Sequence, residues 1–155
     1  MNSRFLRMIG MLAVATLALS ACSIRMPWQE SFETAIPNAL LATDLGITEA
    51  EADTSTSGFA VNLSVGLNFE TDDLVADDLH TMLELIVDNN NLSRVYGLKI
   101  FAVLGPDNPD VYADVDYIDL GSLGDELGFE KSDSEYGTAE EFSANWDDVV
   151  DYLNE

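Results

Sequence analysis

Residues 59–69 read FAVNLSVGLNF, and this stretch decides the fold. Apolar side chains alternate with small or polar ones, and the apolar set is Phe59, Val61, Leu63, Val65, Leu67 and Phe69. Because successive side chains of a β-strand point to opposite faces of a sheet, the alternation predicts a strand with one buried face. Other elements of the chain must then cover that face.

Further strands are expected on both sides of this one. Residues 94–104 are apolar on both faces, which predicts a more central strand. The turn sequence GPDNPD at 105–110 follows, and residues 111–117 alternate again, so the two strands are expected to form a hairpin. Residues 47–54 form a weaker, more polar candidate strand before the first one.

Two longer stretches carry the apolar spacing of an amphipathic helix, namely i, i+4, i+7, i+8 and i+11. They are residues 72–88 and residues 139–153. Thr71 is expected to cap the first helix, and Thr138 with Glu141 is expected to form a capping box on the second. Shorter helices are expected at 37–45, with Pro37 in the first turn, and at 119–127, with Asp119 as the cap.

The order of these elements predicts an α+β domain. A mainly antiparallel sheet of about four strands is expected, with the helices packed on one face. The succession of strand, strand and helix resembles a ferredoxin-like fold with permuted order.

The composition narrows the classes of partner. The 155 residues include 29 Asp and Glu against 6 Lys and Arg, for a formal net charge of −23, with 47% hydrophobic residues. That hydrophobic content suits one folded domain and not a disordered acidic tail. The charge argues against sequence-independent binding to nucleic acid or to anionic lipid, because both need clusters of Lys and Arg that this chain lacks, so nucleic acid is not an expected partner. Since Cys22 and His80 are single, a disulfide within the chain and a Cys/His zinc site are also excluded.

The amino-terminal residues have the pattern of an export signal. Arg4 and Arg7 precede an apolar stretch at residues 8–19, and the small residues Ser20 and Ala21 come before Cys22. The apolar stretch is shorter than the roughly 20 residues that a membrane-spanning helix needs. The pattern therefore predicts a cleavable signal peptide.

The sequence Leu19-Ser20-Ala21-Cys22 resembles the lipobox of bacterial lipoprotein precursors. The resemblance implies that the Cys22 sulfur receives a diacylglyceryl group and that Cys22 becomes the first residue. It further implies a signal peptide at 1–21, a lipidated cysteine and tether at 22–33, and one acidic domain at 34–155 on the extracytoplasmic face of the cell membrane. An ordinary signal peptide cleaved after Ala21 is the alternative.

The tether at residues 23–31 (SIRMPWQES) is short. At roughly 3.3 Å per extended residue it reaches about 30 Å, which keeps the domain near its membrane. Arg25 and Trp28 suit a position at the lipid interface, although both are equally compatible with a simple linker.

A second resemblance carries no chemistry. Ser57-Gly58-Phe59, Thr71-Asp72-Asp73 and the segment from Asp119-Leu120 to Leu127-Gly128 resemble small uncharacterised lipoproteins of actinobacteria. The similarity spans residues 40–130 and brings no catalytic motif with it.

Three sets of residues are candidates for a site, each with a plainer alternative. His80 lies one helical turn from Asp77 and Glu84, so it is either a pH-sensitive group or general acid, or a surface histidine in a helical charge pair. Asp114 and Asp116 share one strand face and are weak candidates for a divalent cation, against a diffuse acidic surface. Several aromatic residues line either a ligand groove or the core: Tyr96, Phe101, Tyr112, Tyr117, Phe129, Tyr136 and Trp146.

These observations predict a lipid-anchored binding or interaction module without enzymatic activity or cofactor. An envelope protein is the expected partner. The edge strand at 47–54 could accept a partner's strand, although its acidic side chains are also the usual defence against such pairing. A small-ligand binder that serves a transporter is the alternative, and an envelope hydrolase is the less favoured one.

Overall fold

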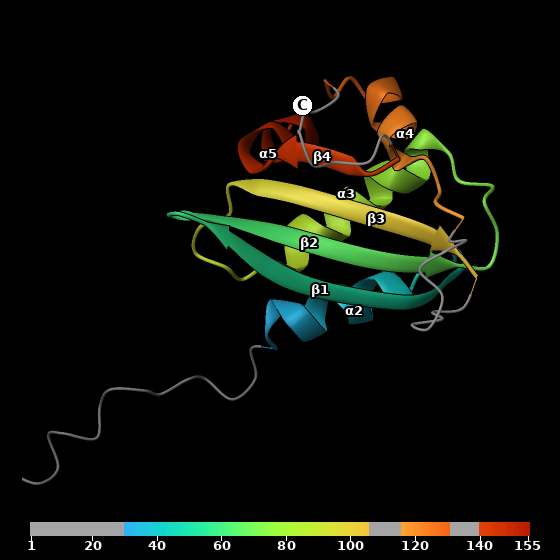
Figure 1. Cartoon of the computed structure of the whole chain (residues 1–155), viewed down its shortest axis with the longest axis horizontal. Helices are drawn as coiled ribbons and strands as arrows, with labels where there is room; N and C mark the ends of the chain where they lie inside the picture. Colours follow the sequence, from blue (N-terminus) through green and yellow to red (C-terminus); the bar gives the residue numbers. More distant parts are fainter. Residues whose placement is uncertain (1–29, 106–115, 131–139) are drawn as a thin grey trace, which may run out of the picture.

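The computed structural model describes residues 30–105, 116–130 and 140–155. The alternating stretch forms β2 (Ala60–Phe69), in which Leu63, Val65, Leu67 and Phe69 are buried. It belongs to a four-stranded sheet with β1 (Ile47–Ser57), β3 (Gly97–Leu104) and β4 (Phe142–Asn145), in the order β1-β2-β3-β4 (Figure 1). Two of the three pairings are antiparallel, and together with the helices they confirm the α+β class.

The tight hairpin of this sheet joins β1 to β2. Its loop is Gly58-Phe59, and Gly58 has a φ of 63°, a left-handed conformation that glycine adopts without a steric penalty. The sequence placed Phe59 on the buried face of the strand, which is wrong, because Phe59 lies in the turn and its side chain is fully exposed. The alternation of apolar and polar residues continues into the turn, so it cannot show that the strand starts at Ala60 and not at Phe59.

For the hairpin expected from residues 94–117, the described residues show the first strand and one bridge to the second. Tyr117 forms an isolated antiparallel bridge with Val103 of β3, and the Leu104 amide donates to the Asp116 carbonyl. Residues 111–115 of the expected strand lie outside the described residues. The strand β3 is also shorter than expected, since it begins at Gly97 and not at residue 94.

The helix α3 (Ala76–Asn89) carries the chain from β2 to β3, which are parallel neighbours. In the ferredoxin-like fold another strand separates two such strands, so the expected resemblance does not extend to the strand order. The expected Thr71 cap is also wrong. The helix begins after Val75, and the Asp78 carboxylate accepts the Val75 amide at 2.9 Å.

The first described helix, α2 (Phe32–Leu41), starts earlier than expected. The prediction for residues 37–45 assumed that Pro37 occupies the first turn, but Pro37 lies inside the helix. An apolar stripe at Phe32, Ile36 and Leu40 packs onto the sheet and fixes the helix. Burial of this stripe outweighs the hydrogen bond that proline cannot donate.

The short helix α4 (Leu120–Glu126) agrees with its prediction. The Asp119 carboxylate accepts the Ser122 amide at 2.9 Å, so the expected cap is confirmed. Gly128 follows with a φ of 90°, which ends the helix.

The carboxyl-terminal stretch divides into a strand and a helix. Residues 142–145 form β4 beside β3, and α5 (Trp146–Leu153) begins only afterwards. The expected capping box of Thr138 and Glu141 is therefore wrong, since Thr138 lies outside the described residues and Glu141 precedes a strand. Phe142 is buried as expected, but it belongs to the sheet and not to a helix. The helical spacing and the alternation of a strand both place this residue on the inward face.

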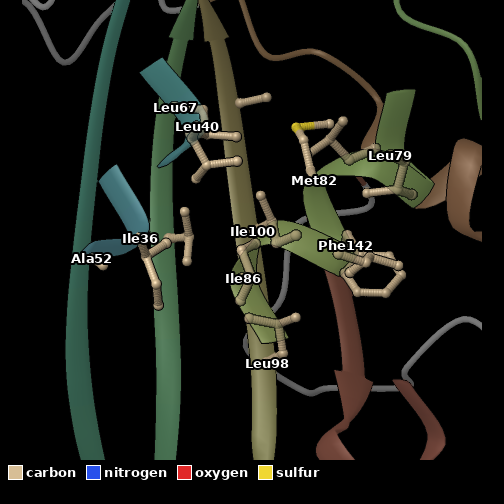
Figure 2. Close-up of a cluster of buried hydrophobic side chains, with 14 of the residues drawn as sticks. Ile36, Leu40, Ala52, Leu67, Leu79, Met82, Ile86, Leu98, Ile100 and Phe142 are labelled. Atoms are coloured by element: carbon tan, nitrogen blue, oxygen red, sulfur yellow. The ribbon is translucent and has the colours of Figure 1, made fainter. Parts of the chain in front are cut away.

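The core lies between one face of the sheet and the helices α2 and α3. Figure 2 shows the side chains of Ile36 and Leu40 from α2 and of Leu79, Met82 and Ile86 from α3 meeting those of the strands, which include Leu67, Leu98, Ile100 and Phe142. On the other face β2 presents Asn62, Ser64 and Asn68, none of which is buried. The described helices thus cover one face, as expected.

Candidate functional site

Lys99 and Glu141 form an ion pair at the sheet. Lys99 is in β3 beside Ser143 of β4, and Glu141 stands two positions before Ser143, so both side chains emerge on the same face. The Lys99 Nζ donates to the Glu141 Oε1 at 3.0 Å, and the Glu141 side chain is 4% exposed against 31% for Lys99. Glu141 is thus a carboxylate withdrawn from water, and the ammonium group of Lys99 is what compensates it.

His80 joins α3 to α5. Its Nδ1 lies 2.9 Å from the hydroxyl of Tyr152, and the two rings meet edge to face with centroids 5.5 Å apart. Its Nε2 lies 3.6 Å from the Glu84 Oε1, so the expected helical partner is in place and forms a charge pair when the imidazole is protonated. The side chain of His80 is 39% exposed. The sequence revealed the carboxylate partner of His80 but not the tyrosine.

The hydroxyl of Tyr152 is held in its neutral form. Partial burial, followed by the negative charges of Asp77 and Glu84, raises its pKa above the ordinary value near 10. Because Tyr152 keeps its proton, its hydroxyl can donate to the His80 Nδ1 or accept from it, according to the imidazole tautomer. In either case the contact links α3 to α5.

An aromatic cluster continues from Tyr152 into the core. Phe129 meets Tyr152 with ring centroids 5.0 Å apart and meets Phe142 at 5.1 Å, both edge to face. Gly124 of α4 closes the other side, where an added Cβ would lie 2.8 Å from the Phe142 ring. Phe129 is thus partly core, as the plainer alternative for the aromatic residues expected.

An open groove of about 1040 Å³ lies over this cluster, along β4. Its walls come from the start of β3, the segment 127–130 and α5, and its side chains include Tyr96, Lys99, Phe129, Glu130, Asp148, Asp151, Tyr152 and Glu155. Four of these are carboxylic acids against one lysine, which Glu141 already compensates. The groove therefore suits a positively charged occupant.

The groove contains only some of the residues that the sequence singled out. Tyr96 and Phe129 line it, whereas His80 and the buried Glu141 do not. Trp146 packs partly buried against the core, and Tyr117 is 47% exposed beside β3. Tyr112 and Tyr136 lie outside the described residues, and Phe101 is half-buried in β3.

Only one of the two carboxylates proposed to bind a divalent cation lies within the described residues. Asp114 lies outside the described residues, and Asp116 is exposed just before the Tyr117 bridge. Within the described ranges, no group of three or more His, Cys, Asp or Glu side chains is arranged to hold a metal ion.

Cys22 and residues 23–29 of its tether also lie outside the described residues, which begin at Glu30. Among the helices of the described part, none has the length and apolar character needed to cross a bilayer. Comparison with protein-family models, with curated proteins and with solved structures found no match to this chain.

Sequence reasoning missed two features of this region. Lys99 is a lone cation in an apolar strand, and a cation at such a position needs a carboxylate partner, so its pairing was foreseeable although Glu141 was not. The contact of Tyr152 with His80 joins residues 72 positions apart, and no local pattern signals it.

Proposed function

We propose that this protein is a lipoprotein anchored at the extracytoplasmic face of a cell membrane through a diacylglyceryl group on Cys22, and that its folded part is a non-catalytic interaction module. The observation that carries the proposal is the lipobox Leu19-Ser20-Ala21-Cys22 behind Arg4, Arg7 and an apolar stretch. Two or more acyl chains on one residue give stable attachment, whereas a single chain gives only marginal binding. An acidic protein can then remain at a membrane without a basic patch.

The arrangement of the domain is compatible with this anchor. The described structure begins at Glu30, eight positions after Cys22, and α2 starts at Phe32. The intervening chain spans less than about 30 Å even when extended. The domain would therefore stay at the membrane surface, where a partner in the envelope can meet its groove or its sheet edge.

The anchoring is tested by replacing Cys22→Ala in the producing cell and separating membrane from soluble fractions. The variant should move to the soluble fraction, because the thiol that receives the lipid is gone. Ser23→Ala is the matched control and should stay with the membrane, since it leaves the lipobox intact. Unchanged membrane association of Cys22→Ala would contradict the proposal.

Ligand binding in the groove is the second candidate function. The observation that favours it is the combination of four carboxylic acids with the aromatic rings of Tyr96, Phe129 and Tyr152 around one hollow. Aromatic faces and carboxylates together attract organic cations. Calorimetric titration with spermidine should show saturable binding that Asp148→Asn and Asp151→Asn weaken, and titration without heat would dismiss this ligand class.

A further inference from the structure

The tip of the β1–β2 hairpin carries an exposed phenylalanine, Phe59, within a segment that has no charged residue. Phe59 lies at its apex in the two-residue loop with Gly58, and its side chain is fully exposed. From Thr54 to Phe69 the sequence contains no Asp, Glu, Lys or Arg, although the chain contains 29 acidic residues. Phe59 contributes nothing to the core, and single exposed apolar side chains are common on protein surfaces, so the uncharged segment around Phe59 is the feature that distinguishes this tip.

The described chain begins at the same end of the sheet as this tip. β2 and β3 are parallel, so both begin there, and the Tyr96 amide donates to the Val61 carbonyl at 2.8 Å. The loop that leads into β3 contacts the residue pair just before α2, because the Asn91 Nδ2 donates to the Glu30 carbonyl at 2.6 Å. In Figure 1, α2 begins on the left of the molecule, where the hairpin tip also projects.

The distribution of charge distinguishes the two ends of the sheet. No acidic residue occurs from Asn89 to Gly105, and the loop before β3 adds the exposed Arg94 and the half-exposed Tyr96. Acidic side chains at this end belong to the flanking elements, namely Glu30 and Glu33 at the start of α2 and the carboxylic acids of the groove beside Tyr96. At the opposite end, β2 is followed directly by Glu70, Asp72 and Asp73, all exposed.

We propose that the uncharged hairpin tip, with Phe59 at its apex, touches the lipid surface to which Cys22 tethers the chain. This inference rests on the proposed function, because the lipid on Cys22 would hold Glu30, which lies at the same end of the sheet as the tip, within about 30 Å of the bilayer. Phenylalanine is among the residues whose apolar side chains enter the boundary between lipid headgroups and acyl chains, and a tip without carboxylates avoids repulsion by anionic lipid. The contact would orient the groove relative to the membrane and thus limit the partners that reach it.

The test uses the lipidated mature chain, residues 22–155, in which Cys22 is the single cysteine and is blocked by its lipid. Phe59→Cys then introduces one free thiol for a nitroxide label, and Val75→Cys, exposed at the start of α3 on the opposite end, is the control. Both proteins are reconstituted in vesicles of phosphatidylethanolamine and phosphatidylglycerol. The collision rates of each label with oxygen and with a water-soluble nickel chelate are measured by electron paramagnetic resonance.

The label at position 59 should show a several-fold higher ratio of oxygen to nickel collisions than the label at position 75. Equal, water-like ratios at both positions on protein that floats with the vesicles would overturn the membrane contact and leave the anchor intact; a tip that serves a protein partner gives this result. Protein that carries no lipid and does not float would overturn the anchor and the contact together. The two failures are therefore distinguishable.

Discussion

At the scale of single residues, the pair of Lys99 and Glu141 has unequal surroundings. Glu141 is nearly excluded from water, whereas Lys99 keeps about a third of its side chain exposed. Removal of the lysine leaves a buried carboxylate without its partner, while removal of the carboxylate leaves an ammonium group that can still reach water. The pair thus predicts an asymmetry that a symmetric surface salt bridge would lack.

Lys99→Met should lower the free energy of unfolding by about 1–3 kcal/mol, and Glu141→Gln should lower it by clearly less. The double variant Lys99→Met with Glu141→Leu should recover much of the loss, because no buried charge remains. Urea unfolding of the four proteins measures these differences. Equal costs of the two single variants would show that Glu141 is better hydrated than its burial indicates.

Tyr152 predicts an effect of alkaline pH. Its pKa is raised in the folded state by burial and by Asp77 and Glu84, so the folded protein holds this proton more tightly than the unfolded chain. The stabilisation is complete below the unfolded pKa near 10 and is lost as the pH rises through the folded value. Tyr152→Phe should therefore flatten the decline of the free energy of unfolding above pH 10.

The matched control for this experiment is Tyr117→Phe, because Tyr117 is exposed beside β3 and has no aromatic contact among the described residues. Chemical unfolding at a series of pH values from 8 to 11 measures the slope for each protein. A slope that Tyr152→Phe leaves unchanged would contradict the raised pKa.

At the scale of elements, α4 and β4 meet through a glycine and a phenylalanine. An added methyl group at Gly124 would lie 2.8 Å from the Phe142 ring, which Phe129 holds in place from another side. Alanine favours a helix over glycine by about 1 kcal/mol, but overpacking a fixed ring costs about 1–3 kcal/mol. The packing cost should prevail.

Gly124→Ala should therefore destabilise the protein, and Phe142→Leu should relieve the clash when the two are combined. The double variant should be more stable than the sum of the single effects predicts, with a coupling of about 1 kcal/mol. Thermal or urea unfolding of all four proteins closes the cycle. Additive effects would mean that α4 shifts away from β4 freely.

The same elements show how far the sequence predicts the fold. The strand at 60–69 and the cap at Asp119 follow from local rules, since neighbouring residues alone determine them. The strand β4 does not follow from local rules, because Phe142 fits the apolar stripe of a helix and the buried face of a strand equally well. The pairing of Phe142 with Ile100 is also non-local, since it joins residues far apart in the sequence. Local periodicity identified Phe142 as core but could not choose its element.

The candidate site was predictable to a similar degree. The lipidation of Cys22 stays a prediction from its motif, whereas Glu84 was found as a partner of His80 because both lie on one helix. The groove depends on β4 and α5 meeting the start of β3, as in the bond from the Trp146 amide to the Tyr96 carbonyl. Such non-local contacts leave no trace in the spacing of residues.

At the scale of the whole molecule, we propose that one covalent bond holds an acidic α+β domain at a membrane. The formal net charge of −23 of the full chain opposes adsorption to anionic lipid, so attachment of this domain would depend on the acyl chains of Cys22. The groove, the outer face of the sheet and the hairpin tip would then all lie near the bilayer.

Mass spectrometry of the protein purified from the membranes of its own cells tests this central claim most directly. The account predicts a mature chain that starts at Cys22 and carries the mass of a diacylglyceryl group on that residue. A chain that begins at Cys22 with a free thiol, or one that retains residues 1–21, would contradict it.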